Sequence, residues 1–342
     1  MSGTVILVPG FWRAGGCNST RYTMDEVRFE LVTEIRPAVL SLARRTPLIH
    51  SDWLSRCHGA DVFLKYENLQ VTGSFKIRGA VAAVAGLSRD QRSAGVVACS
   101  AGNHGQGIAL AAQRFGIPCR VVVPKKVPRV KANAIRSFGA ELSISPHDGY
   151  DATQEWMYEN LDRWAATVIS PFEHPRVIAG NGGTTALEIF EDGPELESVL
   201  VPCGGGGCAV GVGVVAKVMR PGLRVIGVNT DASPGMWMSR RDGKPWLEVD
   251  SEPTIADGIE GGIGPVTFEL GRRFIDDVIV AKEASVRRAV AELARRERVV
   301  VEGAGAVGVA ALSDPSLPPG PLCIILTGGN IDPELLTELL GE

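Results

Sequence analysis

The sequence predicts an α/β protein in which helices cover parallel sheets, and three observations point to this fold class. Short β-branched runs alternate with longer segments whose apolar residues recur every three or four positions, as in strand–helix units with parallel strands. Of the 342 residues, 41 are glycine, and many stand where an expected strand ends. Hydrophobic residues make up 45% of the chain, which is enough for a buried core and excludes a disordered chain.

The alternation places each element in turn along the chain. A helix of small residues is expected just after Lys76. The expected strands lie at 96–99, 119–123, 141–144, 167–169, 198–201, 224–228, 277–280 and 323–326. The other expected helices lie at 105–115, 130–138, 151–165, 184–190, 208–219 and 284–296. Because 91–170 reads as a self-contained unit, we predict a small α/β domain there, inserted into a large domain made of 1–90 and 171–342.

Charge and cysteine content exclude several classes of function. The chain has 35 basic and 39 acidic side chains, so nothing favours nucleic acid or an anionic membrane as a partner. The longest uncharged stretch, 198–216, holds several glycines and a proline, which suits strand–loop–helix better than a membrane span. The apolar run at 5–12 has neither the basic leader nor the cleavage site of a secretory signal. The seven cysteines form no CxxC pair, so we expect no metal site and a cytoplasmic location.

Four consecutive glycines connect the strand expected at 198–201 to the helix that follows it. They are Gly204, Gly205, Gly206 and Gly207, called here the tetraglycine loop. Successive backbone N–H groups at a helix N-terminus can cradle a phosphate, although the run could also be a flexible link. Neither a P-loop nor a dinucleotide fingerprint is present. Similar Gly-rich segments at 100–105, 179–184 and 327–330 are expected to follow strands as well.

Lys76 stands in an unusual setting, the segment Ser74-Phe75-Lys76-Ile77-Arg78-Gly79. Most lysines are solvated surface charges. A lysine partly removed from water at a helix start, however, loses its proton more easily and becomes nucleophilic. A reactive lysine together with a separate phosphate cradle suggests pyridoxal phosphate, because that cofactor presents both an aldehyde and a phosphate.

At this point the sequence resembles a known family. Its motifs are similar, in order, to those of fold-type II pyridoxal-phosphate enzymes, and most of all to the serine/threonine dehydratases and serine racemases. The matching segments are 74–79, Ser100-Ala101-Gly102-Asn103-His104-Gly105-Gln106-Gly107, the tetraglycine loop and Thr327-Gly328-Gly329-Asn330, with shorter matches at 46–48, 63–70, 254–258 and 302–306. The resemblance implies a tryptophan synthase β-like fold: two parallel-type α/β domains with the cofactor between them.

The resemblance also implies roles for individual residues. Lys76 would hold the cofactor and then act as the base at the substrate α-carbon. Phe75 would pack near the pyridine ring, Asn103 would bind the ring hydroxyl, and Thr327 would face the ring nitrogen. The tetraglycine loop, helped by Cys208, would bind the phosphate. The substrate carboxylate would lie on one loop made of Ser100, Ala101, Gly102, Asn103 and His104. The side chain of His104 could instead be a polar helix cap, and Thr327 an ordinary strand-end hydroxyl.

The implied activity is an ammonia-lyase that turns a 3-hydroxy amino acid into a 2-oxo acid and ammonia, acting as a homodimer. A racemase needs a proton donor on the second face of the α-carbon, where serine racemases carry a serine and this chain has Ala101. Racemisation is therefore the weaker alternative. A non-catalytic ligand-binding protein is another, and a nicotinamide oxidoreductase is more distant.

Three departures from the family pattern bear on the substrate and on metal binding. The segment 179–184 carries one residue more than the family's usual Ala-Gly-Gln-Gly-Thr. Asn229 stands where many members have a metal-binding glutamate, and an amide is a poor ligand for Mg²⁺ or Ca²⁺. Tryptophans lie within 231–246, a segment interpreted as turn and packing. The longer segment and the tryptophans suggest a substrate bulkier than threonine, such as phenylserine.

Overall fold

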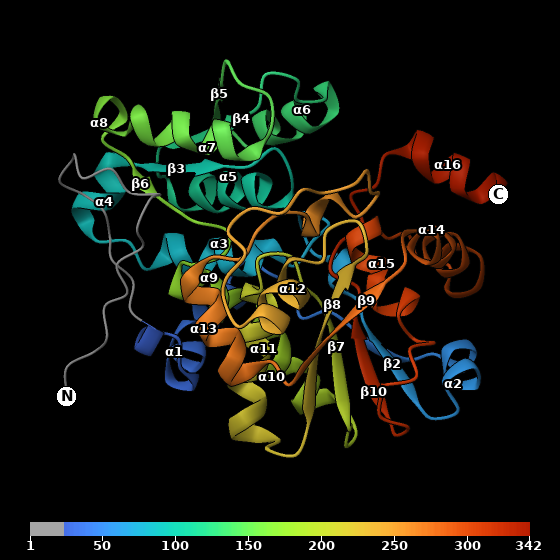
Figure 1. The fold of residues 1–342 in the computed structure, drawn as a ribbon. Coiled ribbons are helices and arrows are strands. Elements are labelled where there is room, and N and C mark those ends of the chain that lie inside the picture. The colour runs from blue at the N-terminus through green and yellow to red at the C-terminus, as the bar shows by residue number, and fades with distance from the viewer. Residues whose placement is uncertain (1–23) are drawn as a thin grey trace.

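Two sheets form the core of the computed structural model, which describes residues 24–342. The smaller sheet and its helices lie above the larger one in Figure 1. The N-terminal apolar run at 5–12 and Cys17 lie outside the described residues. Among the residues that are described, no helix combines the length and the apolar character needed to cross a membrane. The uncharged stretch 198–216 forms a strand, a loop and a helix, as predicted.

The larger sheet has six strands in the order β1-β2-β10-β7-β8-β9, parallel except for β1, which is antiparallel to β2. Its strands are β1 (Leu48–His50), β2 (Val62–Lys65), β7 (Ser198–Pro202), β8 (Arg224–Thr230), β9 (Asp277–Ala281) and β10 (Leu322–Ile325). The smaller sheet is parallel throughout, in the order β5-β4-β3-β6. Its strands are β3 (Val96–Cys99), β4 (Cys119–Val123), β5 (Glu141–Ile144) and β6 (Thr167–Val168). All strands of the smaller sheet fall within 91–170, but the domain boundaries themselves stay a prediction.

Helices cover both sheets, and several begin or end at capping residues. Ser51 caps α2 by accepting a hydrogen bond from the Leu54 amide, and Gly116 ends α5 in the left-handed conformation that glycine adopts readily. The helices are α1 (Phe29–Leu40), α2 (Asp52–His58), α3 (Lys76–Ala85), α4 (Arg89–Ala94), α5 (Asn103–Phe115), α6 (Arg129–Ser137), α7 (Tyr150–Glu159), α8 (Leu161–Trp164), α9 (Pro175–Ile178), α10 (Thr184–Asp192), α11 (Gly207–Met219), α12 (Gly235–Asp242), α13 (Pro265–Phe274), α14 (Glu283–Glu292), α15 (Gly303–Ala310) and α16 (Pro333–Gly341).

The predicted α/β class is confirmed, and every predicted strand is present with its ends shifted by no more than two residues. The helix predicted at 151–165 is divided into α7 and α8, and the one at 284–296 ends in a π-helical turn, Leu293–Glu297. The edge strand β1 was not predicted, and neither was β2. The first is only three residues long, and the second ends on the charged Lys65.

Two predictions about loops are wrong. The segment 231–246, expected to be turn and packing, contains the helix α12. The Gly-rich segment at 179–184 does not follow a strand: Ala179–Gly183 form a buried π-helical turn that joins α9 to α10. A π-turn contains one residue more than an α-turn, so the extra residue is absorbed here without interrupting the helix.

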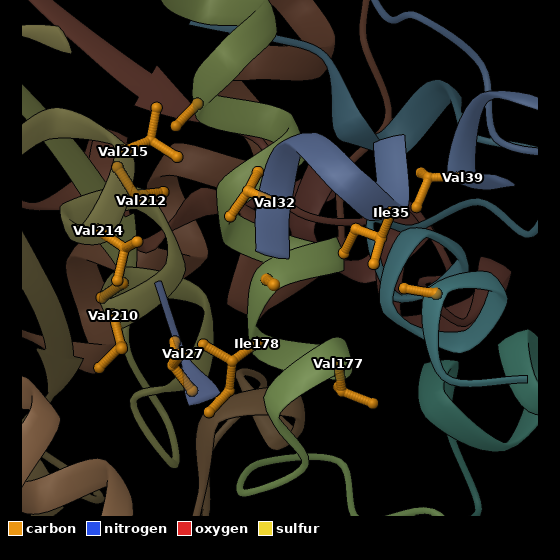
Figure 2. Packing of buried hydrophobic residues seen from close by; sticks show 14 of the residues in the cluster. Val27, Val32, Ile35, Val39, Val177, Ile178, Val210, Val212, Val214 and Val215 are labelled. Carbon is orange, nitrogen blue, oxygen red and sulfur yellow. The ribbon is translucent and has the colours of Figure 1, made fainter. Parts of the chain in front are cut away.

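This π-turn lies at the centre of the main hydrophobic core. Figure 2 shows Ile178, the residue just before the π-turn, with Val32 and Ile35 of α1 above it and the valines of α11 to its left. The core extends through α3, which packs closely on α5 of the smaller sheet, where Gly107 lies against Ala80. Helix α3 therefore contacts both the main core and the helices of the smaller sheet, and a residue at its start lies between the two sheets.

Candidate active site

Lys76 is the first residue of α3, and the backbone before it is tied to the end of β10. The amide of Phe75 donates to the Thr327 carbonyl at 3.0 Å, and Thr327 is buried. The Lys76 Nζ atom lies 5.1 Å from the centre of the Phe75 ring and 5.3 Å from that of Phe172. Burial lowers the pKa of Lys76 to about 8, although Cys208 and Glu302 oppose that shift. The amine therefore loses its proton more readily near neutral pH than a solvated lysine does.

The tetraglycine loop connects β7 to α11, as predicted. Gly206 adopts a φ of +83°, which a residue with a side chain rarely tolerates. Within residues 24–342, the amides of 204–209 donate no hydrogen bond to any acceptor. A Cβ atom at Gly205 would lie 2.6 Å from the Phe172 ring, and one at Gly206 would lie 2.6 Å from the Met236 methyl. The loop is thus a row of open donors in tight packing, the arrangement that binds a phosphate.

A second group of open amides lies at the start of α5, at the end of β3. The amides of Asn103, His104 and Gly105 have no acceptor in the described part of the chain, while the Ser100 hydroxyl accepts from the Gly102 amide at 3.3 Å. Ala101 contributes no polar side-chain atom to this loop. A carboxylate fits such a helix start, since both the amides and the helix dipole favour an anion.

The side chain of His104 contacts the Ile169 carbonyl and is not one of the groups expected to bind the carboxylate. Its Nε2 atom lies 3.0 Å from the Ile169 carbonyl, its Nδ1 atom has no partner among residues 24–342, and the residue is buried. Burial, and next the charge of Lys76, lowers the pKa of His104 to about 3. The imidazole is therefore neutral, so any help it gives to an anion comes from its backbone amide.

Three polar side chains, those of Asn103, Glu302 and Asn330, are joined by hydrogen bonds. Asn103 Nδ2 donates to Glu302 Oε1 at 2.7 Å, and Asn103 Oδ1 accepts from Asn330 Nδ2 at 2.7 Å. Glu302 can only accept when ionised, and it therefore keeps the NH₂ group of Asn103 on its own side. In the described part of the chain no acceptor binds the second N–H of Asn103, so it is available to a ligand.

The structure thus brings Lys76, Phe75, Asn103, the tetraglycine loop, Cys208 and Thr327 into one region, along with the loop at 100–104. Sequence reasoning assigned no role to Phe172, Glu302 or Asn330. Glu302 and Asn330 belong to matched motifs at 302–306 and 327–330, which was a signal that could have found them. Phe172 follows β6 with no motif of its own.

A network of buried charged side chains anchors α3 through Arg78. The Arg78 guanidinium binds Glu67 at 2.7 Å and Glu188 at 2.8 Å, and Lys65 Nζ binds Glu188 at 2.7 Å. All four side chains are at most 1% exposed. Thr46 completes the network by donating its hydroxyl to Glu67 at 2.5 Å. Since Arg78 lies two residues after Lys76, the network holds the start of α3 in place.

The donor set fits pyridoxal phosphate: an amine with a lowered pKa, aromatic rings beside it, and open amides for a phosphate. Residues 24–342 contain no group of three or more His, Cys, Asp or Glu side chains placed to hold a metal ion. Asn229 instead makes two hydrogen bonds, one to the Cys203 carbonyl and one from the Trp237 amide.

Glu302 makes the stability of this site depend on pH. Burial, and next the charge of Asp257, raises the pKa of Glu302 from 4.5 to about 7. Between pH 4.5 and about 7, Glu302 keeps a proton in the folded chain that it has lost in the unfolded chain. The free energy of unfolding therefore falls as the pH rises through this window. We expect Glu302→Gln to remove a slope of at most about 1.4 kcal/mol per pH unit. Urea unfolding of both proteins across the window measures this, and parallel profiles would contradict it.

Comparison with known proteins agrees with this chemistry. A family described as "Pyridoxal-phosphate dependent enzyme" matches residues 39–328. The chain is 42% identical to the L-threonine ammonia-lyase of Thermotoga maritima over 318 residues, which is 92% of this chain and 79% of that protein. It is 36% identical to the catabolic L-threonine dehydratase of Escherichia coli strain K12, covering 92% and 96% of the two chains. The crystal structure of serine racemase from Dictyostelium discoideum superposes with a TM-score of 0.83 at 30% identity, covering 90% and 99%.

Proposed function

The chain belongs to the family of pyridoxal-phosphate-dependent enzymes, and from that premise we propose that it is an ammonia-lyase acting on L-threonine or L-serine. The Cα–H and Cβ–O bonds of the substrate break, and water leaves. A water molecule then displaces the nitrogen, so that the net products are a 2-oxo acid and ammonia.

One observation carries the proposal: Lys76 lies close to two helix starts that present open amides. The Phe172 ring beside Nζ also lies against Gly205 of the tetraglycine loop, and the Lys76 carbonyl lies against Gly107 of α5. One helix start is therefore available for the cofactor phosphate and the other for the substrate carboxylate. An amine between two anion sites is the arrangement that a phosphorylated aldehyde and an amino acid require together.

Bound pyridoxal phosphate supplies the aldehyde that receives the substrate amine and the ring that accepts the electrons of the α-carbon. The neutral Lys76 amine takes the α-proton, and its lowered pKa makes that form more accessible than in a solvated lysine. The amides at 103–105 hold the carboxylate. The Phe75 and Phe172 rings lie 5.1 and 5.3 Å from Nζ and cover part of it, which reduces its contact with water. Asn103, fixed by Glu302 and Asn330, offers one N–H to the ring hydroxyl.

Thr327 bears on the choice of reaction. We propose that its hydroxyl faces the ring nitrogen. A hydroxyl at this place could not keep that nitrogen protonated as a carboxylate would, so the bound cofactor would supply a weaker electron sink. Thr327 would therefore favour loss of the β-hydroxyl over racemisation.

The two sequence features that suggested a bulkier substrate are accounted for elsewhere in the fold. The extra residue of 179–183 lies in the buried π-turn rather than in a pocket. The ring of Trp237 lies against Arg241, and the indole of Trp246 donates to Asp242. Threonine and serine are therefore the proposed substrates, and phenylserine is kept as a comparison in the assay.

Racemisation is the second candidate, favoured by the similarity to a serine racemase structure. Ala101 supplies no proton donor for the second face of the α-carbon, and Ser100 stands one residue too early in the loop to replace it. A non-catalytic ligand-binding protein would have no need of a lysine with a lowered pKa. The homodimer and the cytoplasmic location stay predictions.

The test is an assay of the cofactor-loaded protein with L-threonine, L-serine and phenylserine. We expect 2-oxo acid and ammonia in equal amounts from threonine or serine. Chiral chromatography on the same samples detects D-serine. Formation of D-serine without 2-oxo acid would favour the racemase. Turnover of phenylserine but not of threonine or serine would support the bulkier substrate. If none of the three amino acids is converted, the non-catalytic ligand-binding protein is favoured.

A further inference from the structure

Asn229 lies at the carboxyl end of β8, where it is 1% exposed. In the register of β7 and β8, Pro202 pairs with Val228, so Asn229 stands beside Cys203. Cys203 is the residue immediately before the tetraglycine loop. A buried amide at this place has no part in the chemistry described above, yet it touches the backbone that enters the loop.

The side chain of Asn229 makes two hydrogen bonds of opposite kind. Its Nδ2 atom donates to the Cys203 carbonyl, and its Oδ1 atom accepts from the Trp237 amide at 2.9 Å. Reversing the amide would set oxygen against oxygen and N–H against N–H, so the orientation is fixed. Among side chains of this size, only an amide offers a donor and an acceptor in this geometry.

Both hydrogen-bond partners of Asn229 are connected to the tetraglycine loop, one along the chain and one by packing. Cys203 continues directly into Gly204, and Trp237 follows Met236, whose methyl group lies against Gly206. The four glycines have no side chains with which to hold their own conformation, and Gly206 is in the left-handed region. Their open amides converge on an anion only if the surrounding structure fixes the backbone.

We propose that Asn229 is a positioning residue that holds the tetraglycine loop in its anion-binding conformation through Cys203 and the start of α12. The inference rests on the proposed function, because it takes the anion to be the cofactor phosphate. The amide acts here without an ion. A carboxylate at 229 would face the Cys203 carbonyl, and a hard cation between the two oxygens would be needed to bridge them.

The test compares wild type, Asn229→Asp and Ser239→Ala. Ser239 is the matched control: it is buried in α12 and bonds Gly235 and Trp246, so its loss removes two hydrogen bonds of α12 while both hydrogen bonds of Asn229 stay. The readouts are the dissociation constant for pyridoxal phosphate, the ³¹P chemical shift of the bound phosphate, and threonine turnover at saturating cofactor, each with EDTA and with added Mg²⁺ or Ca²⁺.

For Asn229→Asp in EDTA we expect the dissociation constant to rise about tenfold or more, with a changed ³¹P shift. Added cation should restore part of the affinity, while turnover at saturating cofactor stays near wild type. Ser239→Ala should bind the cofactor within about twofold of wild type. If Asn229→Asp does not fold, Asn229→Ser, which keeps a hydroxyl donor, is compared in the same way.

Two results would overturn the inference alone: an unchanged dissociation constant and ³¹P shift in Asn229→Asp, or an equal loss of affinity in Ser239→Ala. In both cases wild type would still bind the cofactor and turn over threonine. A wild type that binds no pyridoxal phosphate would overturn the proposed function and this inference with it.

Discussion

Changing Lys76 to alanine is expected to reduce 2-oxo acid formation by at least about 10⁴-fold, because the same amine attaches the cofactor and moves the α-proton. Lys76→Arg should be equally inactive. It keeps a positive charge, but a guanidinium does not lose its proton at working pH and so cannot serve as base or nucleophile. Steady-state assays with threonine measure both variants.

Lys217→Ala is the control for this experiment. Lys217 lies on α11 but pairs with Asp276 at 2.6 Å and is partly exposed, so its loss should leave turnover unchanged. Both Lys76 variants should still bind the cofactor through the tetraglycine loop, with an altered visible spectrum. A Lys76→Ala protein that turns over threonine at the wild-type rate would remove this residue from the reaction.

Replacing Glu188 with alanine should lower the free energy of unfolding by about 3–5 kcal/mol. Glu188 binds both Arg78 and Lys65, and without it two buried cations share the single carboxylate of Glu67. Burial alone would raise the pKa of Glu67, yet Arg78 and Thr46 hold it below its ordinary value. The network therefore needs both carboxylates ionised. Urea unfolding monitored by circular dichroism measures the loss.

Glu191 provides the matched control on the same helix, α10. It pairs with Arg36 and Arg45 at the surface, where its side chain is 34% exposed. Glu191→Ala should cost less than about 1 kcal/mol, since exposed ion pairs are screened by solvent. Equal losses in Glu188→Ala and Glu191→Ala would mean that the buried network contributes no more than a surface pair.

Much of the fold and the centre of the site could be predicted from the sequence, because both depend on local patterns. The strands from 96 to 326 alternate with helices of regular period, and Lys76, Asn103 and the tetraglycine loop stand in short ordered motifs. The buried charges could not be predicted. Taken one at a time, Lys65, Glu67, Arg78 and Glu188 read as surface residues, and only the folded chain shows that they neutralise one another.

Other features depend on long-range contacts that no local pattern reports. Phe172 reaches both Lys76 and Gly205 from a loop after β6, and its neighbours in sequence give no sign of this. From the sequence, Asn229 was interpreted only as the replacement of a metal-binding glutamate. Its two hydrogen bonds, to the Cys203 carbonyl and from the Trp237 amide, are visible only in the folded chain. The π-turn at 179–183 was interpreted as a loop because its glycines are typical of loops, but they allow close helix packing instead.

That π-turn has a mechanical consequence. On one side Asn181 accepts a hydrogen bond from Gly79, one turn beyond Lys76, at 2.8 Å; on the other, Gly182 abuts the Cys208 carbonyl at the start of α11. The start of α3 and the start of α11 are therefore held at a fixed spacing by one Asn181 hydrogen bond and one direct backbone contact. We expect the distance between Lys76 and the tetraglycine loop to suit a cofactor of one length only. An analogue whose phosphate arm is longer by one methylene should be rejected even though every group that would bind it is present.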